Sequence, residues 1–163
     1  MQLTGRDTEI IEWLTINKGA TINQINKMFF TNYTTCSIRL KKLADNKFLK
    51  VEKHPVLNKK VYYIKRLPSY HALILTDFII ENKGNIEFMQ REYKLKNNKV
   101  DCIIILKTGK IIIVEIDIYN TTKDKKIEEI WKALEKVEGE KEVWIISKRE
   151  RQKKNNKVIY RVI

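Results

Sequence analysis

Three carboxylates stand within or beside two unusually apolar segments of this chain. Asp101 precedes the run 103–105, and Glu115 and Asp117 directly follow the run 111–114. Both runs are continuously apolar rather than alternating, which is typical of strands that are covered on both faces. A carboxylate in such a strand costs free energy unless it is paired, hydrogen-bonded or bound to a metal. Asp101, Glu115 and Asp117 therefore need a partner, which is a cation, a hydrogen-bond donor or a metal ion.

The turn between the two runs decides whether these carboxylates converge. A two-residue turn ending at Gly109 would place Asp101 opposite Ile116, with the carboxylates on opposite faces of the sheet. A three-residue loop that ends on Gly109 in the left-handed conformation would instead place Asp101 opposite Glu115. Glycine at this position favours the second arrangement.

The elements around these residues predict a sheet with helices against it. After Ser69, a helical pattern extends to about residue 83, and a second helix is expected from Thr121 or Thr122 to about Val137. Strands are expected over residues 86–95, 100–106, 110–118, 143–147 and 158–162.

This order of elements, with Asp101 on one strand and Glu115-Ile116-Asp117 on the next, resembles the PD-(D/E)XK nuclease fold. In that family such carboxylates bind magnesium, so the resemblance implies Asp101, Glu115 and Asp117 as candidate catalytic residues and Asp101 and Glu115 as candidate magnesium ligands. The family's third residue in the second motif is a lysine that helps to activate water. Here that residue is Asp117. The lysines that could replace it are Lys107, Lys110, Lys125 and Lys126.

Because the expected lysine is missing, we expect Asp101 and Glu115 to pair with lysines or to cap backbone groups at the sheet edge. No cofactor is then required. The alternative is an active magnesium site.

The N-terminal part of the chain contains three helix starts. Thr4 with Asp7, and Thr21 with Gln24, each fit a capping box, and the third start is Thr31 or Asn32. Apolar residues at helical spacing then form one buried face on each helix. The core residues expected on these helices are Ile10, Ile11, Leu14, Ile22, Ile25, Phe29, Cys36, Leu40 and Leu43.

The third helix and the segment after it carry polar and basic side chains of the kind that bind DNA. Residues 48–53 and 60–66 are strand-prone and flank a basic tip, which predicts a two-stranded wing. Small polar groups near the start of a recognition helix meet base edges, and cations meet phosphates. The candidate DNA-binding residues are Asn32, Tyr33, Thr34, Thr35, Ser37, Arg39, Lys41, Lys42, Lys59 and Lys60.

The charge distribution agrees with a nucleic-acid partner. The net charge is +13, and residues 1–67 hold 13 Lys and Arg against 5 Asp and Glu, whereas residues 68–163 hold 20 against 15. Such a field attracts polyanions without selecting a sequence. The basic run 148–157 is most simply a solvated loop, with an added phosphate-binding surface as the alternative.

Two domains are expected, a winged helix-turn-helix over residues 1–67 and a small α/β nuclease-like sheet domain over residues 68–163, which makes the chain α+β. Pro68 and a helix-capping Ser69 mark the boundary. The isolated Cys36 and Cys102 and the two histidines show no zinc-site spacing. We expect no signal peptide and no membrane partner, and therefore a cytoplasmic location.

Over most of residues 1–120 the chain resembles the replication-relaxation family of plasmids and other mobile elements, which joins a winged helix to a degenerate nuclease-like domain. The segments that carry the resemblance are 3–7, 21–30, 39–43, 71–73 and 114–117.

The resemblance implies a sequence-specific double-stranded DNA-binding protein that acts in plasmid replication, transfer or their control. The nuclease-like domain would serve as a scaffold for a homodimer or for contact with a replication or transfer protein. The alternatives are a magnesium-dependent DNA endonuclease and a plain transcriptional regulator.

Overall fold

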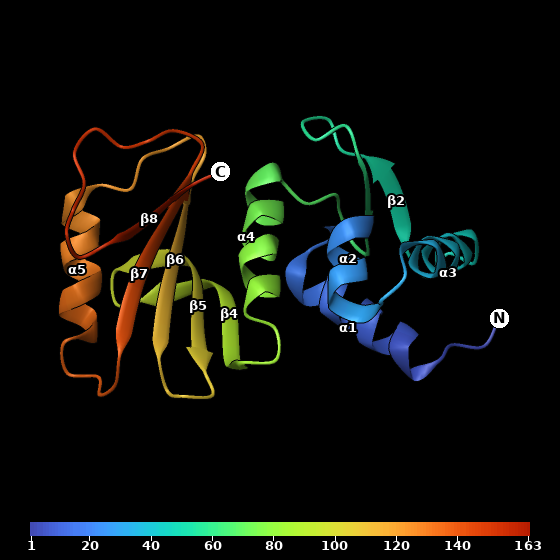
Figure 1. Ribbon diagram of the computed structural model, residues 1–163, viewed down its shortest axis with the longest axis horizontal. Helices are drawn as coiled ribbons and strands as arrows, with labels where there is room; N and C mark the ends of the chain where they lie inside the picture. Colours follow the sequence, from blue (N-terminus) through green and yellow to red (C-terminus); the bar gives the residue numbers. More distant parts are fainter. The chain divides into compact units, whose positions relative to one another are not determined.

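The computed structural model describes residues 1–163, which form two compact units, Met1–Lys83 and Gly84–Ile163. Figure 1 shows helices and strands in both units, and the chain as a whole is a mixed α/β protein with two sheets.

The first unit combines four helices with a small antiparallel sheet, in which the strands have the order β1-β3-β2. The two-residue strand β1 was not expected from the sequence. The elements are α1 (Gly5–Asn17), β1 (Ala20–Thr21), α2 (Ile22–Phe29), α3 (Tyr33–Asp45), β2 (Lys50–Lys53), β3 (Lys60–Tyr63) and α4 (Tyr70–Glu81).

The helix starts follow from local side-chain chemistry. The Thr4 N–H donates to Asp7 Oδ2 at 2.6 Å, and the Asp7 N–H donates to Thr4 Oγ1 at 3.3 Å. Thr21 and Gln24 form the second capping box, with distances of 3.0 and 3.3 Å. Both predicted boxes are confirmed, and Asn32 is the N-cap of the third helix.

The core of the first unit lies between the first three helices and the small sheet. Ile10, Leu14 and Ile25 are fully buried there, together with the predicted inward face of α3. Trp13 packs edge-on against Phe29, with ring centroids 5.6 Å apart. That face of α3 comprises Cys36, Leu40 and Leu43.

Helix α4 belongs to the first unit, so the division of the chain falls one helix later than the expected boundary at residue 67. The Gln24 amide donates to Leu73 O and to Asp77 Oδ1 at 2.8 Å each, which links α2 to α4. A Cβ atom at Gly19 would lie 2.8 Å from the Pro68 ring, because Pro68 is packed closely against the turn after α1. The segment that was expected to be the domain boundary is therefore part of the packed unit.

The second unit is a five-stranded sheet in the order β4-β5-β6-β7-β8. The first three strands run antiparallel, and the last three run parallel. Its elements are β4 (Ile86–Leu95), β5 (Asn98–Leu106), β6 (Ile111–Asp117), α5 (Asp124–Leu134), β7 (Lys141–Ser147) and β8 (Ile159–Val162).

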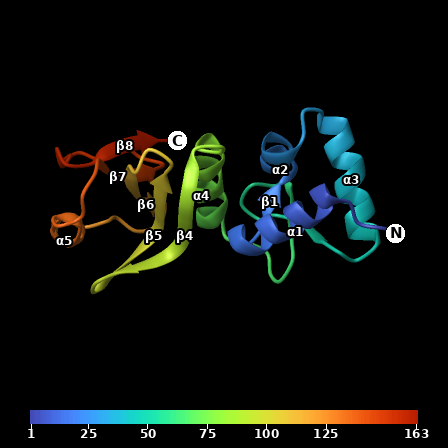
Figure 2. The ribbon, with the colours of Figure 1, turned by 90° about the horizontal axis from the view of Figure 1, so that it is seen from below.

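Helix α5 covers one face of this sheet, as Figure 2 shows in the view from below. Ile127 and Ile130 of α5 share a buried cluster with Ile113 of β6 and Ile145 of β7. All residues of β6 from Ile111 to Ile116 are buried, as the continuous apolar run predicted. The element order and the mixed sheet are compatible with an α+β nuclease-like fold.

Candidate functional site

The β5–β6 hairpin brings Asp101 and Glu115 together across the two strands. The register pairs Cys102 with Val114 and continues to Ile105 with Ile111. One further step along this ladder places Asp101 opposite Glu115.

The hairpin turn explains this register. The Leu106 N–H donates to Lys110 O at 2.9 Å, and the Gly109 N–H donates to Leu106 O at 2.8 Å, which leaves three residues in the loop. Gly109 has a φ of 86°, the left-handed conformation that glycine adopts without steric cost. The predicted three-residue loop is confirmed, and with it the convergence of Asp101 and Glu115.

A lysine reaches this carboxylate pair from α5. Glu115 lies two residues beyond Ile113 and therefore on the face that α5 covers. The Lys126 ammonium is 2.6 Å from Glu115 Oε1, and it also donates to Lys99 O at 2.9 Å. Of the four lysines that the sequence offered, Lys126 is the one that the structure pairs with Glu115.

Burial dominates the electrostatics of Glu115, which is only 4% exposed. Burial and the neighbouring charge of Asp101 raise the pKa of Glu115 to about 7, against the opposing effect of the Lys126 ammonium. Asp101 Oδ2 accepts the Ile116 N–H at 2.7 Å. In this pair, Asp101 is therefore a carboxylate that accepts a backbone N–H, and Glu115 is a carboxyl group whose pKa lies near neutral pH.

Asp117 takes a different role from its two neighbours. Asp117 Oδ2 accepts the Thr122 N–H at 2.8 Å, and Asp117 Oδ1 accepts the Thr122 hydroxyl at 2.7 Å. Asp117 thus stabilises the turn that leaves β6, and the structure does not join it to Asp101 and Glu115.

The donor set does not fit a preformed magnesium site. No group of three or more His, Cys, Asp or Glu residues in the chain is placed to hold a metal ion. Glu115 Oε1 faces an ammonium, and one oxygen of Asp101 is bound by a backbone N–H. A cation would have to displace Lys126 from Glu115 to gain two carboxylate ligands.

The cysteines are core residues, as the sequence indicated. Both are buried and free. Burial raises the pKa of Cys36 to about 11 and the pKa of Cys102 to about 12, so both remain thiols at neutral pH.

The cap and the first turns of α3 carry the uncharged members of the candidate DNA-contacting set. Asn32 Oδ1 accepts the Thr35 N–H at 2.9 Å and the Thr35 hydroxyl at 3.3 Å, so the Asn32 side chain is engaged as the helix cap. Tyr33 and Thr34 are exposed, and Ser37 is half-buried.

The exposed face of α3 contains an apolar residue that is not among the candidate DNA-contacting residues predicted from the sequence. Ile38 is 64% exposed, and it lies one helical turn after Thr34 and one turn before Lys41 and Lys42. The sequence could have indicated this exposure, because Ile38 lies between polar and basic residues on the outer face, whereas Cys36 and Leu40 define the inward face.

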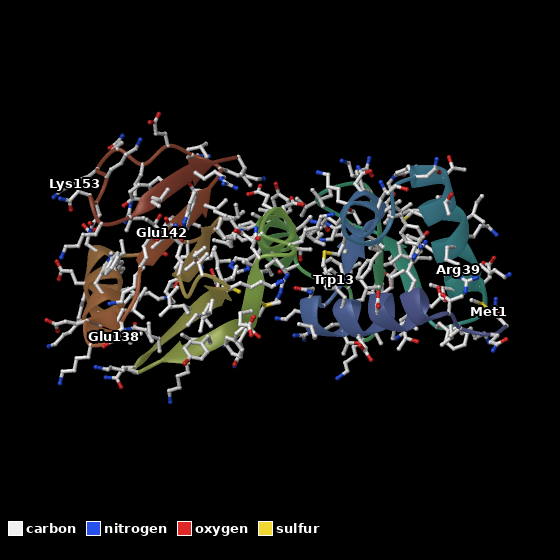
Figure 3. The ribbon with its side chains drawn as sticks, turned by 60° about the horizontal axis from the view of Figure 1, so that its bottom comes forward. Met1, Trp13, Arg39, Glu138, Glu142 and Lys153 are labelled. Atoms are coloured by element: carbon white, nitrogen blue, oxygen red, sulfur yellow. The ribbon has the colours of Figure 1, made fainter.

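The sequence suggested Arg39 as one of the cations that bind DNA, but its guanidinium is already paired within the unit. The Arg39 Nε–H donates to Asp7 Oδ1 at 2.7 Å, and its Nη2 donates to Asp7 Oδ2. Asp7 is fully buried, and the hydrogen bonds from Arg39 hold the pKa of Asp7 well below its usual range. Arg39, labelled on α3 in Figure 3, therefore anchors α3 to the start of α1.

The hairpin between β2 and β3 carries exposed Lys59 and Lys60, as expected. His54 organises its base. The His54 Nδ1 accepts the N–H groups of Val56 and Leu57 at 3.2 and 3.3 Å, and its Nε2 lies 3.1 Å from Pro68 O. Both ring nitrogens of His54 are thus engaged within the unit, which gives the imidazole a structural role.

Comparison with known proteins gives one distant similarity. No family model matches the sequence, and no curated protein matches it. Among solved structures, the chain is similar to a repair endonuclease from Pyrococcus abyssi, with 13% sequence identity and a TM-score of 0.39. The match covers 57% of this chain and 44% of that chain. No helix of the present chain is long and apolar enough to cross a membrane.

Proposed function

We propose that this chain is a sequence-specific double-stranded DNA-binding protein that uses its first unit as a winged helix-turn-helix. The observation that carries the proposal is the outer face of α3, where Thr34, Ile38, Lys41 and Lys42 stand exposed on a helix whose opposite face is buried. A duplex admits an α-helix of this kind in its major groove.

Each part of that face has a distinct role in the proposed complex. Thr34 and Thr35 offer hydroxyl groups to base edges, and Ile38 offers an apolar contact to the methyl group of thymine. Lys41 and Lys42, with Lys59 and Lys60 of the hairpin, bind phosphates. The Lys41–Asp45 pair, at 2.9 Å, is solvent-exposed and yields readily to a phosphate.

We further propose, from the resemblance of the sequence to the replication-relaxation family, that this binding activity serves a plasmid or other mobile element in replication, transfer or their control. The second unit then acts as a nuclease-like scaffold for a second copy of the chain or for a replication or transfer protein. The bonds that Asp101, Asp117 and Glu115 make within the unit support a structural role for the carboxylates.

Binding to the source replicon tests this function. Fragments of that replicon that bind the full chain should cluster at one place, and a cluster at a replication or transfer origin supports the proposal. Clustering at promoters alone would favour a transcriptional regulator. Binding without any preferred fragment would contradict sequence-specific recognition.

Substitutions on α3 should separate phosphate contacts from base contacts. Lys42→Ala should weaken binding to all duplexes and reduce the slope of log K against log salt by about one unit, whereas Ile38→Ala should change the ranking of duplexes. Fluorescence anisotropy over a salt series measures both effects.

Lys132→Ala, an exposed lysine on α5, is the matched control and should leave the salt slope unchanged. An unchanged slope for both Lys42→Ala and Lys41→Ala would remove α3 from the DNA interface.

A second candidate function is a magnesium-dependent DNA endonuclease, which the position of Lys126 beside Glu115 favours. We expect the purified chain to leave its cognate duplex intact in magnesium or manganese, because the carboxylates are already bonded within the unit. Glu115→Gln should change folding stability more than DNA affinity. A supercoiled plasmid carrying the bound fragment is the substrate to use, since a single nick changes its mobility.

Metal-dependent nicking that disappears in Asp101→Asn and Glu115→Gln, with both variants folded, would replace the scaffold role with the endonuclease.

A further inference from the structure

The second unit contains a cavity of about 470 Å³ at the carboxyl ends of β6 and β7. Segments 117–121 and 147–151 line it, together with Tyr160 of β8. Ligands of open α/β sheets bind in the crevice outside the carboxyl ends of parallel strands, and small-molecule sites commonly measure about 300–1,000 Å³. The cavity thus has the position and the size of a ligand site.

Hydrogen bonds between the two loops hold the walls of this cavity. The Arg151 Nη2 donates to Thr122 O, and its Nη1 donates to the Tyr160 hydroxyl at 3.2 Å. The same Tyr160 oxygen accepts the Asn155 N–H at 2.9 Å. Asp117 fixes the other loop through Thr122. The walls are therefore formed before a ligand binds.

The charged groups in the cavity favour an anion. Its two carboxylates already have partners, because Asp117 binds Thr122 and Glu150 binds Lys154 at 3.0 Å. The Arg149 guanidinium, in contrast, has no hydrogen-bond or ion-pair partner in the structure. A guanidinium that is not neutralised is well suited to bidentate recognition of a phosphate.

An aromatic ring completes the chemistry. Tyr119 lines the same cavity, and its side chain is 73% exposed. Exposed aromatic rings beside cations are the usual stacking platforms for nucleobases. An anion site and a stacking surface within one cavity fit a phosphate and a base that are joined by a sugar.

We propose that this cavity binds a nucleoside 5′-phosphate, with Arg149 on the phosphate and Tyr119 against the base. The ligand is either a free nucleotide or the 5′-terminal nucleotide of a nucleic-acid strand, which present the same chemistry. This site is separate from α3 and does not depend on its DNA-binding role.

Calorimetric titration of the full chain tests the proposal with AMP, adenosine and inorganic phosphate as probes. AMP should bind at least about ten-fold more tightly than either fragment, because only AMP uses both contacts. Arg149→Ala and Tyr119→Ala should each weaken AMP binding about ten-fold, and Arg149→Lys should restore part of the loss. Lys153→Ala, in the same basic loop and labelled in Figure 3, is the matched control and should bind AMP as the wild type does.

The source of the nucleotide is resolved with two single-stranded tetranucleotides that differ only in a 5′-phosphate. Tighter binding of the phosphorylated form than of AMP assigns the site to strand ends, and tighter binding of AMP assigns it to free nucleotide. Absence of saturable binding by all probes would overturn the proposal, as would equal AMP affinity in folded Arg149→Ala and wild type. Lys42→Ala should retain AMP binding, so a failure of the DNA-binding proposal is seen separately.

Discussion

Replacing Arg39 with alanine should destabilise the first unit by about 3–5 kcal/mol at neutral pH, because it leaves a buried carboxylate without its counterion. Asp7 is fully buried, and its other partner is Thr4, within the capping box of α1. The side chain of Arg39 is 23% exposed, so most of the lost stability comes from the uncompensated charge of the buried Asp7. Urea unfolding followed by the amide signals of the first three helices measures the change.

The pH dependence of this loss has a definite sign. In the wild type, Arg39 holds the pKa of Asp7 below its ordinary value of 3.8, so the stabilisation is complete above that value and is lost as the pH falls below it. Without Arg39, burial raises the pKa of Asp7, and protonation relieves part of the cost. The difference between wild type and Arg39→Ala should therefore shrink in acid.

Lys42→Ala on the same helix is the control, and we expect its stability to remain within about 0.5 kcal/mol of the wild type, since Lys42 is exposed. Folded Arg39→Ala should keep the wild-type salt slope for DNA binding. A reduced slope with unchanged stability would return Arg39 to the phosphate-binding residues.

The sequence predicted the elements whose causes are local. The capping boxes at Thr4 and Thr21 need only residues three apart, and Gly109 sets the register of the β5–β6 hairpin through its own backbone conformation. The continuous apolar runs correctly indicated strands that are buried on both faces. Such signals are contained in a few neighbouring residues, so no knowledge of tertiary structure is needed to read them.

Contacts between distant residues could not be predicted in the same way. Arg39 and Asp7 are separated by 32 positions, and a basic residue on a helix gives no sign of whether it will meet a phosphate or a buried carboxylate. The position of α4 in the first unit likewise depends on Gln24, which is 49 residues from Leu73.

The candidate carboxylate site was predictable in part. Alternation along a strand put Glu115 on one face, and the turn put Asp101 opposite it. The choice among four lysines needed the placement of α5 over the sheet, which brings Lys126 rather than Lys125 to Glu115. The engagement of Asp117 by Thr122 depends on the loop after β6, for which the sequence offered no periodic pattern.

Lys126, which the sequence could not single out among the four lysines, is also the most informative lysine to replace. Lys126→Met should destabilise the second unit by up to about 1.4 kcal/mol at pH 8, that is, by one pKa unit, and by much less near pH 5, because Glu115 would be left buried without a cation and would stay protonated to higher pH. In the wild type the pKa of Glu115 is already raised from 4.5 to about 7. Folding therefore takes up a proton between these values, and the contribution of Glu115 to stability falls as the pH rises from about 4.5 to about 7. Removing Lys126 raises that pKa further and extends the fall in stability above pH 7.

Urea unfolding of the second unit at several pH values measures the effect, with Lys125→Met, an exposed neighbour on the same helix, as the control. Glu115→Gln should flatten the same pH profile, since glutamine does not titrate. A Lys126→Met loss that is equal at pH 5 and pH 8 would mean that Lys126 acts through packing rather than through the charge of Glu115.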